Sequence, residues 1–329
     1  MNLPWRLAGI NEDGMINIFY KLNSEVMVSQ SETDFANLRK GDVLWIDLLS
    51  PNGEEKRATE AFLDTEIQSR AQAEEIESSS RFFETDKAIF ANTNFLIPGP
   101  EEYSMEAVSF TLIDDSLTTV REVPLRSFTE LQRRIVAMPT RYTSGWVIMA
   151  NILEQRVDLD ADMIELMAKE ISQYSKRINQ QEDINEDFLL DINQLQENTM
   201  LVRENIVDKQ RFISSLMRSN KEPKELENRF SVLLQDITSL INHSNFCFER
   251  LEYLQDTVVG LINLEQNKIM KIFTLISLLL MPPTLVASFY GMNVKLPMSS
   301  LNSAWLIIIG IMILSFAVVL FIFRKKKML

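Results

Sequence analysis

The sequence is poor in the residues that most often carry catalysis. It has one cysteine, Cys247, and one histidine, His243, in 329 residues. A lone cysteine excludes a disulfide within the chain and fits a reducing compartment. A lone histidine leaves few routes for acid–base catalysis, and we find neither a glycine-rich phosphate loop nor a Ser/His/Asp nucleophile set. The sequence therefore argues against an enzyme.

His243 and Cys247 lie four residues apart, which is a metal-ligand spacing. Cys247 also falls on an apolar seam of a predicted helix, described below. We favour packing as its role, with a zinc site as the alternative.

Acidic residues are absent from Ile272 to the end of the chain. That stretch has five of the 33 basic residues and none of the 46 acidic ones, which leaves a net charge of about −18 on the first 271 residues. Such a part repels nucleic acid and suits cations as partners. The start, MNLPWRLAGINEDG, has no basic region before an apolar stretch, so we expect no cleaved signal peptide.

Charge is also absent from two long apolar runs, 272–290 with 19 residues and 304–323 with 20. Each is long enough to cross the roughly 30 Å hydrocarbon core as a helix. The sequence therefore predicts two transmembrane helices joined by a short connector, 291–303.

The basic residues near these spans predict their orientation. Lys268 and Lys271 precede the first span and the basic tail 324–329 follows the second, whereas the connector carries only Lys295. By the positive-inside rule, both termini are cytoplasmic and the connector is outside. We expect a multi-pass protein of the cell (inner) membrane.

The first 150 residues contain runs rich in β-branched and aromatic residues, several of them bounded by Gly, Pro, Asn or Asp. These runs are MINIFYKL, VLWIDLL, KAIFANTNFLI and AVSFTLIDD. We expect a cytoplasmic α/β domain over 1–150.

Glycine is missing from Val157 to Val259, and Leu, Met and Ile recur there at three- and four-residue spacing. This pattern predicts helices. We place them at 157–181, 184–218 and 223–290. The last is on the order of 100 Å long at about 1.5 Å per residue, and residues 151–271 form a cytoplasmic helical domain and stalk that continues into the first span.

Two stripes run along this last helix. The apolar seam consists of Leu226, Phe230, Leu233, Ile237, Leu240, Ser244, Cys247, Leu251, Leu254, Val258 and Leu261. About 200° around the helix lies a polar stripe with Gln235, Thr238, Asn242, Asn245, Glu249, Glu252, Asp256, Gly260, Asn263 and Asn267. In the same phase it enters the first span as Met270, Thr274, Ser277, Met281, Thr284, Ser288 and Gly291.

Hydroxyl side chains on one stripe of an apolar span need a partner other than lipid. One interpretation is a dry contact between helices. The other is a wet conduit formed by several copies around an axis, with acidic rings of Glu249, Glu252 and Asp256 beneath it. Pro282 and Pro283 leave two carbonyls of the span without a main-chain donor, which either face water or mark a kink.

Tyr290-Gly291-Met292-Asn293 directly follows a first span that contains Met-Pro, and a short connector, a second span and a lysine-rich end come after it. This arrangement resembles the CorA family of divalent-cation channels. The similarity is strongest over NKIMKIFTLISLLLMPPTLVASFYGMN and extends more weakly to VLWIDLLSP and AVSFTLIDDSLTTVREV. It implies a homopentameric funnel whose first span lines the pore and whose second span surrounds it. The expected function is conduction of Mg²⁺, and also of Co²⁺ or Ni²⁺, gated by a cytoplasmic divalent cation.

The resemblance also implies the roles of individual residues. The selectivity filter falls on Gly291, Met292 and Asn293, where neutral acceptors hold a hydrated Mg²⁺ through its water shell. The regulatory site pairs Glu75, with Glu74 as its neighbour, with Asp236 on the stalk of the next subunit. The pore-lining rings are Asn267, Met270, Ser277, Met281, Thr284 and Ser288, and Thr274 lies on the same stripe.

Lys295 departs from the family pattern, because members that import magnesium usually have an acidic residue soon after the asparagine of the filter. This leaves zinc, cobalt, nickel or efflux open. One alternative is a zinc transporter of the same superfamily, although Met292 favours the magnesium branch. The other is a two-span coiled-coil scaffold or sensor that conducts nothing.

Overall fold

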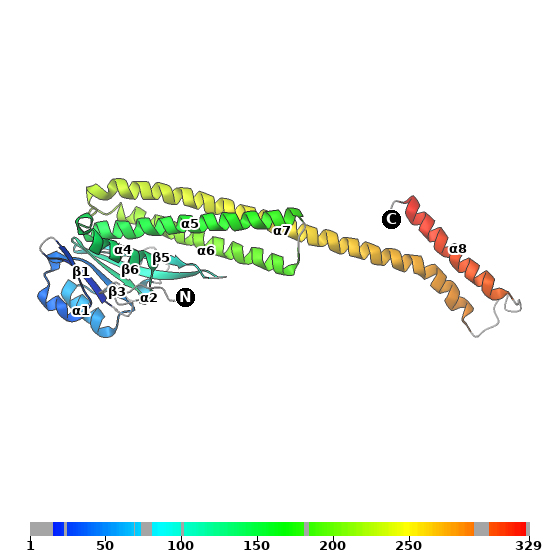
Figure 1. The fold of residues 1–329 in the computed structure, drawn as a ribbon, viewed down its shortest axis with the longest axis horizontal. Coiled ribbons are helices and arrows are strands. Elements are labelled where there is room, and N and C mark those ends of the chain that lie inside the picture. Colours follow the sequence, from blue (N-terminus) through cyan, green and yellow to red (C-terminus); the bar gives the residue numbers. More distant parts are fainter. Residues whose placement is uncertain are drawn as a thin grey trace. The chain divides into compact units, whose positions relative to one another are not determined.

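The computed structural model describes residues 16–22, 25–68, 70–73, 81–99, 102–180, 184–292 and 303–326. The chain divides into two units, Met1–Gln255 and Asp256–Leu329. The first contains a mixed β-sheet and long helices, and the second contains the apolar end of one long helix and a second apolar helix (Figure 1). The predicted fold class, an α/β domain followed by a long helix and a C-terminal apolar helix, is confirmed. The domain limits within it stay a prediction.

The described helices include three that match the long helices predicted from the sequence. In chain order they are α1 (Gly53–Leu63), α2 (Arg70–Ala73), α4 (Arg126–Ala137), α5 (Gly145–Gln180), α6 (Glu186–Leu216), α7 (Lys224–Tyr290) and α8 (Ala304–Lys325), with short 3-10 helices η1 (Glu32–Asn37), η2 (Lys40–Asp42) and η3 (Pro139–Arg141). The ends of α6 and α7 agree with the prediction within two residues. The predicted start of α5 at residue 157 was wrong, because the helix begins 12 residues earlier.

α5 begins early because its first turns belong to the core of the α/β domain. The Gly145 N–H donates to the Asp115 carbonyl at 2.5 Å, and a Cβ at Gly145 would overlap the main chain of Leu117. Trp146 and Met149 follow at once and are buried. Only glycine allows this close approach of the helix to strand β7, and the apolar residues after it then cover the sheet.

The sheet has seven strands in the order β2-β1-β3-β7-β6-β5-β4. Only β3 and β7 pair in parallel among the described strands, and every other neighbouring pair is antiparallel. The strands are β1 (Ile16–Leu22), β2 (Glu25–Ser29), β3 (Val43–Leu49), β4 (Phe82–Glu84), β5 (Ala88–Ile97), β6 (Ser104–Ile113) and β7 (Ser116–Arg121). The four predicted runs coincide with β1, β3, β5 and β6.

β7 was not separated from β6 in the prediction, because only two residues join the strands. Asp114 has a positive φ of 49°, which suits the tight turn of a two-residue hairpin. The sequence AVSFTLIDD therefore ends inside the turn rather than inside a strand. β2 and β4 are the two edge strands. The sequence did not predict them, because such short strands show too few alternating apolar and polar residues.

Both faces of the central strands are buried. On one face Ile46 and Leu48 of β3 pack in a cluster that also contains Phe35 from η1 and Leu63 from α1. On the other face Trp45 lies 5.8 Å from the ring of Phe128 in α4. Burial on both sides explains why β3 reads as a nearly continuous apolar run.

One charge lies within this buried run. Asp47 accepts hydrogen bonds from Arg121 Nη2 at 2.8 Å, from Thr119 Oγ1 at 2.8 Å and from Gln132 Nε2 at 2.8 Å. The Arg121 guanidinium also lies 4.7 Å from the centre of the Phe128 ring. Because Asp47 has several donors, a buried carboxylate is tolerated there, and it fixes β3, β7 and α4 in one arrangement.

A second buried cluster connects α5, α6 and β5. Asp160 forms ion pairs with Lys209 Nζ at 3.0 Å and with Arg156 Nη2 at 3.1 Å, and it accepts from Asn205 Nδ2 at 3.0 Å. Arg156 also donates to the Leu96 carbonyl at 2.5 Å. Both Asp160 and Lys209 have no exposed surface. The two long helices are therefore held to the sheet by charged hydrogen bonds as well as by apolar packing.

Most of the apolar seam of α7 is buried, whereas Leu240 is only partly buried. In the first unit its buried members are Leu226, Phe230, Leu233, Ile237, Ser244, Cys247, Leu251 and Leu254. Polar contacts flank the seam, with Arg229 of α7 paired to Glu154 of α5 at 2.6 Å and Gln255 of α7 bonded to Asn193 of α6 at 3.0 Å. This part of α7 is a packed helix of the first unit.

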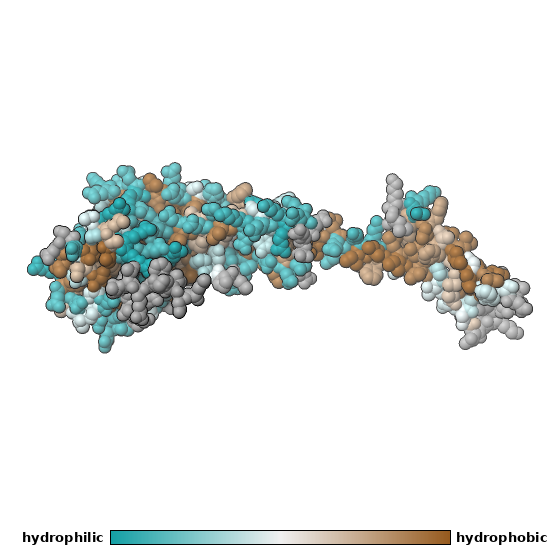
Figure 2. Space-filling model, in the orientation of Figure 1, coloured by the Kyte–Doolittle hydropathy of each residue, from teal (hydrophilic) through white to brown (hydrophobic). Residues whose placement is uncertain are grey.

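Among the described residues, α7 and α8 are the two helices long and apolar enough to cross a membrane. Their most apolar windows have mean hydropathies of 2.0 and 3.2, and at most 6% of either window is buried in the protein. Figure 2 shows hydrophobic residues concentrated on these segments, whereas hydrophilic residues dominate the visible face of the first unit. Apolar helices of this length with no protein cover indicate a membrane protein.

Replacing Asp160 by Asn should destabilise the first unit strongly, because Lys209 and Arg156 would lose the carboxylate with which both form ion pairs while staying buried. The expected loss in the free energy of unfolding is about 3–5 kcal/mol. Thermal or urea unfolding of the full chain in detergent measures it. The exposed Asp162 on the same helix provides the control, since Asp162→Asn should change stability by less than about 0.5 kcal/mol. Similar losses for both variants would contradict a buried ion cluster.

Burial lowers the pKa of Lys209 from 10.5 to about 8, against the opposing attraction of Asp160. Between these two pH values the unfolded chain holds a proton that the folded chain has released, so stability rises with pH there. The cost of the buried charge is fully present below pH 8 and diminishes towards pH 10.5. Lys209→Met removes this dependence, so the wild type should gain stability relative to the variant between about pH 8 and 10. Parallel stability curves for the two proteins would refute the assignment.

Candidate functional site

The candidate site is the polar stripe of α7 and the turn that follows it. Inside the span the hydroxyl of Thr274 donates to the Met270 carbonyl at 2.8 Å, and that of Thr284 donates to the Leu280 carbonyl at 2.7 Å. Each donor is thus satisfied by the preceding turn of the helix, and the oxygen lone pairs stay available. The threonines therefore present acceptors without presenting an unpaired donor.

Pro282 and Pro283 lie inside α7, and the helix continues through them. Proline has no N–H, so the carbonyls of Leu278 and Leu279 receive no hydrogen bond from the residue four positions on. Two main-chain acceptors are thus left about one and a half turns before Thr284. In hydrocarbon such groups are costly, so they need water or another donor.

α7 ends at the glycine of the candidate filter. The Gly291 N–H donates to the Ala287 carbonyl at 2.9 Å. A Cβ at Gly291 would lie 3.2 Å from that same carbonyl oxygen, so a larger residue would crowd the last turn. Met292 follows and is 54% exposed. Two residues discussed above lie outside the described residues: the predicted ligand Asn293, and Lys295, which differs from the acidic residue usual in the family.

The predicted pore-lining residues share one face of α7, because they repeat at three- and four-residue spacing. All are exposed in the single chain: Asn267, Met270, Thr274, Ser277, Met281, Thr284 and Ser288. Large apolar residues on the other faces are exposed as well, among them Phe273 at 66% and Leu285 at 71%. The apolar faces of this helix can lie against lipid. The face with the hydroxyl side chains needs water or another protein surface instead.

A cavity of about 560 Å³ lies beside the end of the first span. Ser288 and Met292 from the candidate stripe line it together with Ile311 of α8. Apart from the hydroxyls of Ser288 and Tyr290, its side chains are apolar, so the cavity offers no set of charged cation ligands.

The cytoplasmic candidates lie on α7. Glu249, Glu252 and Asp256 are exposed. Each follows the preceding one by three or four residues, so the three carboxylates share a helix face. Among the described residues, no three His, Cys, Asp or Glu side chains converge to hold a metal ion.

Asp236 also lies on α7 and is exposed, and its charge acts on Asp158 of α5, a residue that the sequence analysis did not single out. Burial raises the pKa of Asp158, and the negative charges of Glu154, Asp162 and Asp236 raise it further. Carboxylates of α5 and α7 thus produce a negative potential around Asp158, which favours binding of a proton or a cation there. The predicted partners Glu74 and Glu75 lie outside the described residues.

Cys247 packs in the apolar seam, as we favoured, and is 4% exposed. Burial raises the pKa of its thiol, with Arg250 acting in the opposite direction. His243 is exposed on the helix surface. The buried thiol is a structural side chain rather than a reactive one.

Comparison with known proteins identifies the family. A model of the family described as CorA-like Mg²⁺ transporter protein matches residues 40–325. The chain is 34% identical over 297 residues to the magnesium transport protein CorA of Campylobacter jejuni (strain RM1221), with 87% of this chain and 91% of that protein covered. It is 33% identical over 322 residues to the protein of that name from Wolinella succinogenes, covering 96% and 100%.

A solved structure shows the same fold. The CorA magnesium transporter from Methanocaldococcus jannaschii superposes with a TM-score of 0.76 at 16% identity, over 94% of this chain and 98% of that one. Both the sequence matches and the fold cover nearly the whole chain, including the two apolar helices. The chain therefore belongs to the CorA family.

Proposed function

We propose that this protein is a channel that carries divalent cations, principally Mg²⁺, across the cell membrane. The observation that carries the proposal is the stripe of hydroxyl and small side chains on the otherwise apolar end of α7, which leads to Gly291 and Met292. The two relatives named as magnesium transport proteins support the choice of ion. Co²⁺ and Ni²⁺ are the further candidate cargoes.

The proposed assembly is a homopentamer with the first span around the axis and the second span outside it. In this arrangement the polar stripe of each copy faces water and the apolar faces meet lipid or a neighbour, which gives each exposed face suitable cover. A purified complex should have five times the 38.0 kDa mass of the chain. In this proposal both termini lie in the cytoplasm and the connector 291–303 lies outside the cell membrane.

The proposed filter is made by Gly291, Met292 and Asn293. Mg²⁺ sheds its water reluctantly, so five neutral amides can hold the hydrated ion through its water shell without binding it too tightly to leave. Below the filter, the acceptor oxygens of Thr284 and Thr274 continue the path. The apolar rings of Met281 and Met270 supply constrictions that close by losing water.

The proposed control lies on the cytoplasmic side. Rings of Glu249, Glu252 and Asp256 raise the local cation concentration below the pore. Asp236, in its acidic surroundings on α7, pairs with Glu75 and Glu74 of a neighbouring copy to bind a regulatory cation. Such a cation stabilises one conformation only as far as it binds that conformation more tightly.

Flux measurements on the purified full chain test the function. The protein is reconstituted in liposomes that contain a Mg²⁺-sensitive dye, and Mg²⁺, Co²⁺, Ni²⁺ or Zn²⁺ is added outside. Uptake of Mg²⁺ well above that of protein-free liposomes is expected. Uptake of Zn²⁺ without Mg²⁺ would make the protein a zinc transporter, and no uptake of any ion would favour the scaffold.

Asn293→Ala should lower Mg²⁺ flux by about tenfold or more, because it removes one amide acceptor per copy and each is worth about 1 kcal/mol. Asn302→Ala provides the control, since it makes the same change in the same connector. Dye-based flux at equal protein density measures both variants. Equal flux in Asn293→Ala and wild type would remove Asn293 from the filter.

Lys295→Glu should raise inward Mg²⁺ flux at low ionic strength. At a dielectric constant of about 80 and a distance of about 10 Å, one lysine opposes a divalent ion by roughly 0.8 kcal/mol. The gain should shrink as salt screens the charge, and Lys295→Gln should give an intermediate flux. Identical flux for all three side chains at low salt would place Lys295 away from the ion path.

A further inference from the structure

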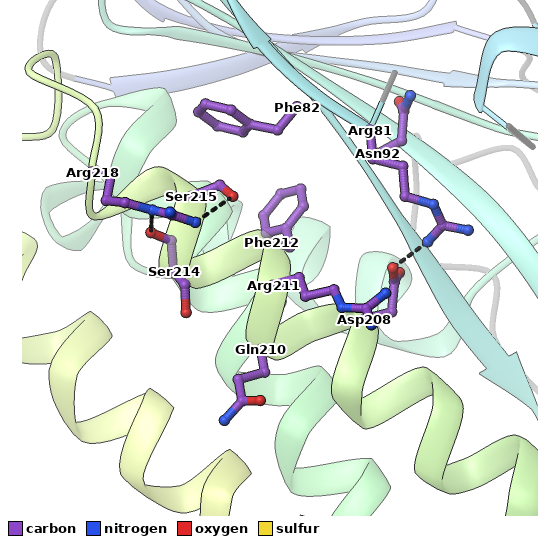
Figure 3. A pocket seen from close by; sticks show the side chains of 10 residues that line it. All are labelled: Arg81, Phe82, Asn92, Asp208, Gln210, Arg211, Phe212, Ser214, Ser215 and Arg218. Atoms are coloured by element: carbon purple, nitrogen blue, oxygen red, sulfur yellow. Dashed lines mark hydrogen bonds and ion pairs between the residues drawn. The ribbon is translucent and has the colours of Figure 1, made fainter. Parts of the chain in front are cut away.

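A pocket on the first unit has a charge opposite to that of its surroundings. The cavity measures about 410 Å³ and lies between the β4–β5 edge of the sheet and the C-terminal part of α6 (Figure 3). Three of its lining residues are arginines and one is an aspartate, so its formal charge is about +2 in a region of the chain that is about −18. The lining residues are Arg81, Phe82, Asn92, Asp208, Gln210, Arg211, Phe212, Ser214, Ser215 and Arg218.

The single carboxylate of the pocket is already occupied. Asp208 pairs with Arg81 through one oxygen, and its other oxygen accepts from Thr93 Oγ1 at 2.9 Å and from the Asn94 N–H at 2.9 Å. Its charge is therefore held by the sheet and by Arg81. Asp208 therefore offsets the charge of Arg81, and Arg211 and Arg218 account for the net positive charge of the pocket.

The donors come from the end of α6 and from the turn that follows it. Arg211, Ser214 and Ser215 belong to the last turns of α6, and Arg218 lies in the turn that follows the helix. Arg218 donates through Nε to the Ser214 carbonyl at 3.1 Å and through Nη2 to Ser215 Oγ at 3.5 Å, which holds its guanidinium at the pocket. Both arginines are exposed. Figure 3 shows them on opposite sides of the Phe212 ring in that view.

We propose that this pocket binds the phosphate group of a small molecule. Guanidinium and hydroxyl donors that line one cavity match the oxygens of a phosphate, and a net charge of about +2 matches its dianion. The cavity lies within the roughly 300–1,000 Å³ typical of small-molecule sites, which favours a phosphate ester such as a nucleoside monophosphate. Phe82, which is partly exposed, offers an aromatic face for the organic part. Inorganic phosphate is the other source of the same group.

This inference is independent of ion conduction, so its test reads binding and not flux. The full chain in detergent is dialysed to equilibrium against radiolabelled AMP, with free Mg²⁺ held constant. Saturable binding of one AMP per chain is expected, with displacement by inorganic phosphate but not by adenosine. The affinity should fall with ionic strength, because the attraction is between charges.

Variants identify the site. Arg211→Gln and Arg218→Gln should each weaken AMP binding by about tenfold or more, as expected for a charge-assisted hydrogen bond. Arg203→Gln serves as the matched control, because Arg203 is exposed on the same helix two turns before Arg211 and lies outside the pocket lining. Its AMP affinity should equal that of the wild type.

The outcomes separate the possibilities. Equal affinity for inorganic phosphate and AMP would support the site and make free phosphate its ligand. Absence of saturable binding of either compound would overturn the proposal. The arginines would then be expected to bind acidic side chains of a partner protein instead. Binding of adenosine as tightly as AMP, or equal weakening by Arg203→Gln, would overturn it as well.

Discussion

The structure depends on one constraint, which is that hydrocarbon offers no hydrogen bonds to a polar group. α7 meets it almost entirely within itself: its main chain is helical, and the Thr274 and Thr284 hydroxyls donate to carbonyls one turn back. The acceptors that remain are the hydroxyl lone pairs on the polar stripe and, on other faces of the helix, the carbonyls of Leu278 and Leu279. The hydroxyl acceptors lie along one face of this apolar helix and suit water and hydrated cations, and this is the physical basis of the proposed path.

In the first unit the polar groups that need partners are charged side chains buried inside the protein. Asp47 and Asp160 are both fully buried, and each has several donors from different elements. These clusters hold α4, α5 and α6 against the sheet, and α7 then packs on those helices through its apolar seam. Any change of arrangement in this unit has to preserve the two clusters, since an unpaired buried charge is costly. We therefore expect the unit to move as a rigid body rather than to deform internally.

Sequence patterns predicted what depends on local chemistry and missed what depends on tertiary contacts. β-branched runs located β1, β3, β5 and β6, and the three- and four-residue repeat located α6, α7 and the seam. The early start of α5 was missed because it depends on the close approach of Gly145 to β7. The acidic group at Asp158 and the arginine pocket were missed because their members come from distant parts of the chain. The motif at Gly291 and Met292 was found only through resemblance, since a short Gly-Met-Asn has little physical signature alone.

The central claim is that the polar stripe of the first span faces water in the assembled protein. The most direct measurement uses the single native cysteine: in a Cys247→Ser background, Thr284→Cys and Leu285→Cys are compared for reaction with a charged, membrane-impermeant methanethiosulfonate. The account predicts that the thiol at position 284 reacts, that the reaction blocks Mg²⁺ flux, and that the thiol at position 285 is protected by lipid or protein. Equal reactivity at the two positions, or reaction at position 285 alone, would contradict it.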